Sequence, residues 1–352
     1  MAHYVFISLQ DEKKISIFTL DEGSGKLTPN SEVQVTDAPS GMATSPDRKF
    51  LYVAHRDPTG ISSWTIDQTT GGLTQIGKIS TESWSAFMST DRTGRYLLSA
   101  YYQAGHVGVH PISANGAVAD PPVEWLETDL GAHAIQTDPS NKFAFVPHIA
   151  RLFDNVMEPP KDQVGPNVIF QFKFDEDTGQ LTPNSPLRLD PGEGLGPRYY
   201  WFHPNLDIVY FSDEQGCSVT GYNLDTVTGR LAAFQTITTL PEGYTGRNTC
   251  SQIQVSPSGK FLYVPNRGHN SIAGFTVDAS NGHLTAIGHV PTEAVPNAFS
   301  LDPGGKFIVA VGSASGGLSS YRIDGDTGKL TPLETFPVGQ RPAGVLISDL
   351  GD

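Results

Sequence analysis

The 352-residue chain contains one pattern that recurs along its length, at intervals of about 45 to 65 residues. Each copy has a short apolar strand, a turn with Pro or Gly, a second strand, a variable loop, a third strand ending in Asp, and a turn leading to Gly-x-Leu. The clearest copies begin at Gly41, His133, Arg198, Ser251 and Asn297, and a weaker copy begins at Ala86. Because the repeat occupies the whole chain, we expect one domain, residues 1–352, rather than the two that length alone suggests.

The two ends of the chain contain complementary parts of a further copy. The segment that starts at His3 lacks the first strand of the pattern, and residues 341–348, RPAGVLIS, resemble that missing strand. Pairing the last strand with the first sheet removes a free edge and closes a ring. The sequence therefore predicts an all-β fold, a seven-bladed β-propeller of four-stranded antiparallel blades closed by the C-terminal strand. A pair of β-sandwiches or a β-solenoid is the alternative.

Two departures from plain strands are visible between and within the units. Charged turns such as DEGSGK and DGDTGK separate the strands, and we interpret them as solvated hairpins without a function. The fourth unit has an extra loop at residues 150–167, ARLFDNVMEPPKDQVGPN. Long loops in compact domains are usually functional or mobile, so this insertion is a candidate lid or specificity loop, with surface decoration as the alternative.

The repeat register predicts which residues surround one mouth of the ring. In an antiparallel blade, the start of the first strand and the end of the second lie at the same edge. The first-strand starts are Ser40, Ala86, His133, Arg198, Ser251 and Asn297, and the second-strand ends are Gln10, Arg56, Tyr102, Ile149, Glu214, Arg267 and Ser313. Ionisable residues concentrate in units four to six.

The ionisable group consists of His133, Arg198, Glu214 and Arg267, with Arg56 farther across the channel. Two guanidiniums can bind a carboxylate or phosphate, and a carboxylate and an imidazole in one cleft can serve as general base and general acid. The alternative is structural, with Glu214 and Arg198 as an ion pair that stiffens the channel and His133 as a core histidine. His148 and His269 are predicted near the same mouth.

Composition excludes several classes of partner. The net charge is −14 and there is no basic run, so nucleic acid and anionic lipid are not expected partners. No apolar stretch approaches the roughly 20 residues that span a bilayer, and the first residues lack the order of a signal peptide, so we expect a soluble, cytoplasmic protein. Cys217 and Cys250 are predicted to be buried free thiols, and no local motif indicates a metal or a cofactor. The sequence predicts no particular oligomeric state.

Longer motifs resemble the lactonase family of seven-bladed propellers, which includes bacterial 6-phosphogluconolactonases and fungal 3-carboxy-cis,cis-muconate lactonizing enzymes. The resemblance is carried by GAHAIQTDPSNKFAFVP, by GPRYYWFHP, by NTCSQIQVSPSGKFLYVPNRGHNSIAGF and by the repeated DxxTGxLTP endings. It covers essentially the full length. It implies that His133, Arg198, Glu214 and Arg267 form the catalytic set, the same four residues that the ring register brings together.

Four positions depart from the phosphogluconolactonase branch of that family. Gln252 stands where the branch usually has an acid, Gln254 replaces a His, Asn297 replaces an Arg and Tyr199 replaces a frequent His. The substitutions at Gln252 and Asn297 weaken the case for a phosphorylated lactone.

The resemblance leads to a metal-independent lactonase that hydrolyses a sugar-acid lactone, with a small lactone or carboxylic acid as its partner and no cofactor. The alternatives are a muconate-type cycloisomerase and a non-catalytic binding scaffold. The predicted substrate-binding residues are Arg56, His148, Tyr199, Gln252, His269 and Asn297.

Overall fold

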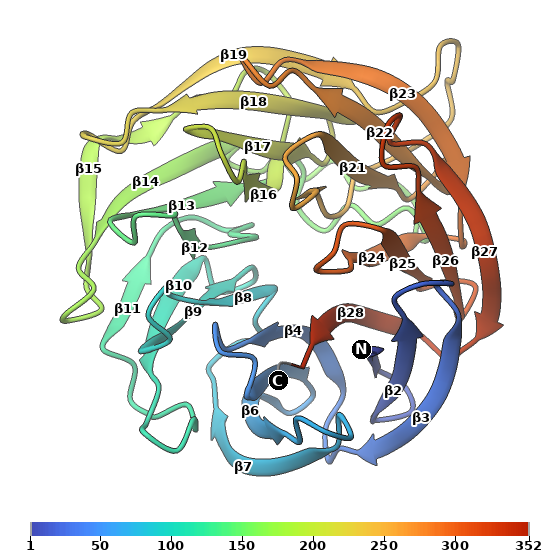
Figure 1. Ribbon diagram of the computed structural model, residues 1–352. Coiled ribbons are helices and arrows are strands. Elements are labelled where there is room, and N and C mark those ends of the chain that lie inside the picture. The colour runs from blue at the N-terminus through green and yellow to red at the C-terminus, as the bar shows by residue number, and fades with distance from the viewer. Residues whose placement is uncertain (1, 351–352) are drawn as a thin grey trace.

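The computed structural model describes residues 2–350 as seven four-stranded antiparallel sheets arranged in a ring (Figure 1). Within that range the chain forms strands, turns and loops and contains no helix. The predicted seven-bladed β-propeller is therefore confirmed, and the β-sandwich and β-solenoid alternatives are wrong. No helix among the described residues is long and apolar enough to cross a membrane.

The first four blades follow the repeat from the N-terminus. Blade 1 contains β28 (Pro342–Asp349), β1 (Ala2–Leu9), β2 (Lys14–Asp21) and β3 (Leu27–Gln34). Blade 2 contains β4 (Pro39–Thr44), β5 (Phe50–Arg56), β6 (Thr59–Ile66) and β7 (Leu73–Ser80). Blade 3 contains β8 (Phe87–Thr90), β9 (Tyr96–Tyr101), β10 (His106–Pro111) and β11 (Glu124–Glu127). Blade 4 contains β12 (Gln136–Thr137), β13 (Phe143–His148), β14 (Val168–Phe174) and β15 (Leu181–Leu189).

The remaining three blades complete the ring. Blade 5 contains β16 (Pro197–Phe202), β17 (Ile208–Asp213), β18 (Ser218–Leu224) and β19 (Leu231–Thr238). Blade 6 contains β20 (Gln254–Val255), β21 (Phe261–Asn266), β22 (Ser271–Val277) and β23 (Leu284–Pro291). Blade 7 contains β24 (Pro296–Leu301), β25 (Phe307–Gly312), β26 (Gly317–Ile323) and β27 (Leu330–Pro337).

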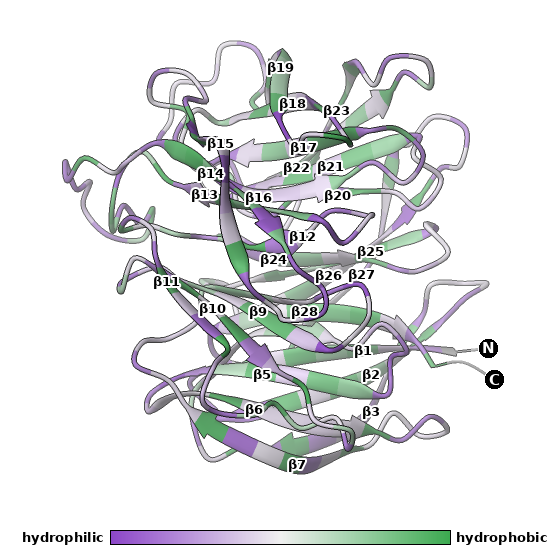
Figure 2. Ribbon diagram, turned by 90° about the vertical axis from the view of Figure 1, so that its left-hand side faces the viewer, coloured by the Kyte–Doolittle hydropathy of each residue, from purple (hydrophilic) through white to green (hydrophobic). Residues whose placement is uncertain are grey.

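Ring closure depends on β28, which pairs antiparallel with β1 from His3↔Asp349 to Leu9↔Pro342. The first and last strands of the chain consequently lie side by side (Figure 2). Val345 and Ile347 of β28 are buried in an apolar cluster with residues of β1 and of blade 7. The last strand therefore joins the two ends of the chain and also fills the seam between the last and first blades.

The turn between the first and second strands shows why the repeat has its residue types. Two residues after the turn Pro or its equivalent, the backbone adopts positive φ at Gly94, Asn141, Gly259 and Gly305. Glycine and asparagine accept this left-handed conformation at low cost, whereas most residues do not. Arg48 occupies the same position in blade 2 with φ 60°. The turn geometry is therefore repeated even where the residue changes.

The outer hairpins have a packing role that the sequence interpretation missed. In blade 2, the Asp67 carboxylate accepts hydrogen bonds from the backbone N–H groups of Thr69 and Thr70. A Cβ added to Gly71, which has φ +68°, would lie only 2.2 Å from the ring of Tyr4 in blade 1, and the Tyr4 hydroxyl donates to Thr69 O at 2.6 Å. Gly229 contacts Phe143 in the same way. Although their tips are exposed, these hairpins hold neighbouring blades together.

The core lies between blades, where the two faces of neighbouring sheets meet. Figure 2 shows apolar residues concentrated in the strands, with hydrophilic residues in many of the connecting loops. The largest fully buried side chains are aromatic, including Tyr52, Tyr101, Tyr200 and Phe211. Cys217 and Cys250 are buried free thiols, as predicted.

Removal of β28 tests its role in closure. A chain ending at Arg341 should lose about 10 °C or more in melting temperature, because it exposes the edge of β1 and removes the buried Val345 and Ile347 side chains. Thermal unfolding followed by circular dichroism would measure this loss. A circular permutant that begins at Gln340, with the original ends joined by a short turn, keeps β28 and should retain the transition. Equal melting of the truncated and full chains would contradict the closure role.

Candidate active site

The predicted mouth exists as a pocket of about 380 Å³. Of the residues that the repeat register placed around the mouth, all except Ser251 line it. Ser251 is fully buried, and its hydroxyl donates to Pro296 O at 2.8 Å. The strand register explains the result, because the start of β16 at Pro197 pairs with the end of β17 at Asp213.

A buried carboxylate between two guanidiniums is the main charged feature of the pocket. Arg198 Nε lies 2.7 Å from Glu214 Oε2, and Arg267 Nη2 donates to Glu214 Oε1 at 2.6 Å. The side chains of Arg198, Glu214 and Arg267 are 6%, 4% and 11% exposed. Arg267 Nη2 also donates to Cys250 O at 2.9 Å. This cluster carries a formal charge of +1, so one positive charge remains available to an anion.

A local irregularity accompanies the placement of Arg198. The register of β16 on β17 shifts between Pro197 and Tyr199, so Arg198 is the extra residue of a β-bulge. Bulges interrupt the alternation of side chains and redirect one of them. An equivalent shift brackets Asn297 in β24, between Pro296 and Ala298. In both blades, the residue that the bulge releases from strict pairing lines the pocket.

His133 lies beside this cluster and is held in its neutral form. Burial, and next to it the positive charge of Arg198, lower the pKa of His133 well below its usual range. The rings of Tyr102 and Tyr199 contact its imidazole, with centroids 5.5 and 5.4 Å away. Its Nδ1 atom and Arg198 Nη1 are both buried without a hydrogen-bond partner in the described part of the chain. A neutral imidazole and an unpaired guanidinium N–H are thus both available to a ligand.

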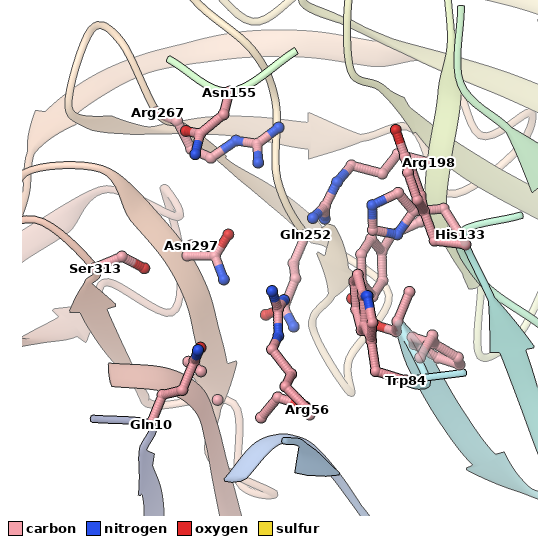
Figure 3. Close-up of a pocket in the computed structure, with 18 of the residues that line it drawn as sticks. Gln10, Arg56, Trp84, His133, Asn155, Arg198, Gln252, Arg267, Asn297 and Ser313 are labelled. Carbon is pink, nitrogen blue, oxygen red and sulfur yellow. The ribbon is translucent and has the colours of Figure 1, made fainter. Parts of the chain in front are cut away.

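Arg56 reaches into the pocket from the opposite side (Figure 3). Its guanidinium lies over the ring of Trp84 at 4.0 Å, and among the described residues it has neither a carboxylate partner nor a hydrogen bond.

Gln252 and Asn297 also line the pocket, and Gln252 Oε1 accepts from Phe299 N at 2.9 Å. Tyr199 completes the wall, with its ring 4.5 Å from the Arg198 guanidinium and its hydroxyl donating to Ala86 O.

Two predicted substrate-binding residues do not line the pocket. His148 is fully buried, and its Nε2 atom lies within hydrogen-bond distance of Thr128 Oγ1 and Asp129 N. It precedes the pocket residue Ile149 by one position, so strand alternation directs it away from the pocket. His269 Nδ1 bonds Ser271 Oγ, and its ring contacts Tyr244 and His289. We therefore leave both histidines out of the site.

Several lining residues had no individual signal in the sequence. They belong to the turn before β8, to the insertion and to the segment before β28: Trp84, Phe153, Asp154, Asn155, Met157, Glu158, Lys161 and Arg341. The unusual length of the insertion was the only pointer to its part of this set. Among the described residues, no group of three or more His, Cys, Asp or Glu side chains is placed to hold a metal ion.

Comparisons with known proteins agree with this geometry. A family model described as "Lactonase, 7-bladed beta-propeller" matches residues 3–347. The chain belongs to this lactonase family. A 6-phosphogluconolactonase of Yersinia pestis (strain Pestoides F) is 32% identical over 351 residues, covering 99% of this chain and 98% of the relative.

Solved structures share the fold at lower identity. The periplasmic gluconolactonase PpgL of Pseudomonas aeruginosa has a TM-score of 0.86 at 23% identity, with 99% of each chain covered. A putative 6-phosphogluconolactonase of Bacteroides fragilis has a TM-score of 0.85 at 23% identity, covering 99% of this chain and 98% of that one. At this identity the likeness concerns the architecture that family members share.

The Glu214 cluster predicts a stability effect that does not depend on any activity. Glu214→Gln should lower the free energy of unfolding by about 3 kcal/mol, because it leaves two buried guanidiniums without their counter-charge. Urea denaturation would measure this change. The double variant Glu214→Gln/Arg267→Gln should be no less stable than the single one, since one of the two repelling cations is gone. A single variant within about 0.5 kcal/mol of the parent would contradict this account.

Proposed function

We propose that this protein hydrolyses a sugar-acid lactone in the pocket at the mouth of the ring. The observation that carries the proposal is the neutral His133 beside the buried Arg198–Glu214–Arg267 cluster, in a pocket of small-molecule size. Membership of the lactonase family and the 6-phosphogluconolactonases among its relatives support this activity.

The proposed chemistry assigns a role to each of the four residues. His133 takes a proton from water as the water oxygen bonds to the lactone carbonyl carbon. Arg198 Nη1, which has no partner in the described structure, donates to the oxyanion that forms. The ring C–O bond then breaks, the His133 imidazolium returns the proton to the leaving alkoxide, and a hydroxy acid is released. Glu214 has both oxygens on arginines, so it positions Arg198 and Arg267 rather than serving as the base.

Arg56 favours an anionic substrate. A guanidinium without a carboxylate partner, placed across the pocket from Arg198 and Arg267, can hold a phosphate or a second carboxylate while the lactone carbonyl lies at His133. Gln252 and Asn297 add polar side chains without adding negative charge beside it. We therefore expect the protein to prefer a phosphorylated sugar lactone to its unphosphorylated counterpart. This preference is expected although Gln252 and Asn297 replace an acid and an arginine that are typical of the phosphogluconolactonase branch.

A lactone panel with active-site variants tests the proposal. The parent chain should open 6-phosphoglucono-δ-lactone, and more slowly glucono-δ-lactone, as followed by pH-stat and corrected for spontaneous hydrolysis. His133→Gln should reduce turnover by about 10² to 10⁴-fold and Arg198→Met by about 10² to 10³-fold. The matched controls His283→Gln and Arg95→Met alter exposed residues outside the pocket and should keep parental rates.

The panel also separates the alternatives. Parental rates in both site variants would contradict the assigned roles. Loss of the ultraviolet absorbance of a carboxylated muconate without net hydrolysis would instead identify a cycloisomerase. Retained activity after dialysis against EDTA is expected, because the proposed steps use only side chains. The cytoplasmic location and the lack of nucleic-acid and membrane partners remain predictions.

The lowered pKa of His133 predicts an unusual pH profile. A base works in its deprotonated form, and burial keeps His133 deprotonated at pH values well below the 6.5 of an ordinary histidine. The value of kcat/KM should therefore stay level between about pH 8 and pH 6 and decline only under more acidic conditions. Initial rates on a lactone measured across this range would check it. A half-maximal rate near pH 6.5 would show that His133 titrates normally.

A further inference from the structure

The insertion at residues 150–167 replaces a short hairpin connection. The equivalent second-to-third-strand connections run only from Asp213 to Ser218 in blade 5 and from Asn266 to Ser271 in blade 6. In blade 4 the chain instead folds back on itself before β14 begins. Its base is closed by backbone hydrogen bonds from Leu152 N to Gln163 O and from Gly165 N to Ala150 O, both 2.8 Å. The tip, residues 153–162, lies at the pocket. Six of its residues line the pocket wall: Phe153, Asp154, Asn155, Met157, Glu158 and Lys161.

One side of the insertion is packed on the aromatic wall of the pocket. Leu152 is 3% exposed and belongs to an apolar cluster with Ala86, Tyr102 and Ile149. The Tyr102 hydroxyl accepts a hydrogen bond from Phe153 N at 2.7 Å, and the two rings lie edge to face. Tyr102 also contacts His133. The root of the insertion is therefore attached to a residue that touches the proposed base.

The other side of the insertion is held by a single arginine from a distant part of the chain. Arg247, in the loop between β19 and β20, forms an ion pair with Asp154 and donates to the backbone oxygens of Asn155, at 3.0 Å, and Glu158. The side chain of Asp154 is only 6% exposed. The three contacts span 89, 93 and 92 residues of sequence, so they depend entirely on the ring.

The Arg247 loop also supports the charged cluster. Asn248 Oδ1 accepts from Gly268 N and His269 N, and Thr249 O accepts from Arg267 N at 3.0 Å. The next residue, Cys250, accepts from the Arg267 guanidinium. One short segment, residues 247–250, therefore holds both the insertion and Arg267.

The tip of the insertion places a hydrogen-bond donor at the pocket. The two acidic side chains of the tip that line the pocket are both paired with cations. Asp154 is paired with Arg247, and Glu158 is paired with Lys161 at 3.0 Å. Asn155 Oδ1 accepts from Met157 N at 3.0 Å, which leaves its Nδ2 group as a donor with no partner in the described structure. Figure 3 shows Asn155 beside Arg267 at the rim of the pocket. Such a donor suits a hydroxyl or carboxylate oxygen of a ligand.

We infer that residues 150–167 form a specificity lid that Arg247 latches over the pocket, and that Asn155 is its substrate-contacting residue. This inference rests on the proposed function and deepens it. A latched lid encloses a single polyhydroxy lactone ring and disfavours a lactone that carries a second sugar. Arg247 acts as a positioning residue, because it touches the lid and not the pocket.

Two variants test the latch and one tests the contact. Arg247→Met removes the latch from the loop side, and Asp154→Asn weakens it from the lid side should the first variant fold poorly. Both should raise KM for a monosaccharide lactone about tenfold with kcat changed less than twofold, because they remove binding and leave the chemistry intact. Asn155→Ala should raise KM about threefold to tenfold, the effect of one lost hydrogen bond. Arg230→Met is the matched control, since Arg230 also donates to a backbone oxygen but lies on an outer hairpin.

Limited trypsin digestion measures how firmly the lid is held, independently of activity. Lys161, exposed near the tip, should be cleaved about tenfold faster in Arg247→Met than in the parent or in Arg230→Met. The preference for glucono-δ-lactone over a disaccharide aldonolactone should fall in the same variant. Equal cleavage in all three chains would overturn the latch, and an unchanged preference would overturn the specificity role. If the parent opens no sugar lactone, the proposed function fails, while the trypsin comparison still decides the latch.

Discussion

Closure of the ring by β28 on β1 is the constraint on which the rest of the structure depends. It leaves neither end of the sheet array open, and it fills the seam between blades 7 and 1 with Val345 and Ile347. Once the ring is closed, the starts of the first strands and the ends of the second strands converge on one mouth. A site drawn from several blades, with residues as distant in sequence as Arg56 and Arg267, follows from that convergence.

The closed ring keeps three charged side chains buried in one cluster. Removing two guanidiniums and a carboxylate from water is costly, and the cluster persists because close pairing compensates for the lost hydration. The same burial lowers the pKa of His133, so one environment holds both the proposed oxyanion donor and the proposed base. The β-bulge at Arg198 shows that blade 5 departs from regular pairing at the residue proposed to bind the oxyanion.

The repeated hairpins and the single insertion contribute differently to the molecule. The Asp-capped hairpins and their glycines recur from blade to blade and hold neighbouring sheets together, as Gly71 does on Tyr4. The insertion of blade 4 occurs once, and it supplies part of the pocket wall, where Asn155 lies beside Arg267 (Figure 3). Within the lactonase family fold, the proposed specificity therefore depends on the segment that breaks the repeat, and the repeat provides the rigid frame to which Arg247 attaches it.

The sequence by itself indicated the blade count, the split blade that closes the ring and most of the positions that surround the mouth, because the repeat recurs along the whole chain and its missing first strand is found at the C-terminal end. It also brought His133, Arg198, Glu214 and Arg267 into one group. Strand alternation beside Ile149 already directs His148 away from the mouth, but only the tertiary structure decided that Glu214 is held by both arginines and that Arg247 reaches the insertion. Bulges and contacts between distant loops depend on packing across blades, which no local pattern encodes.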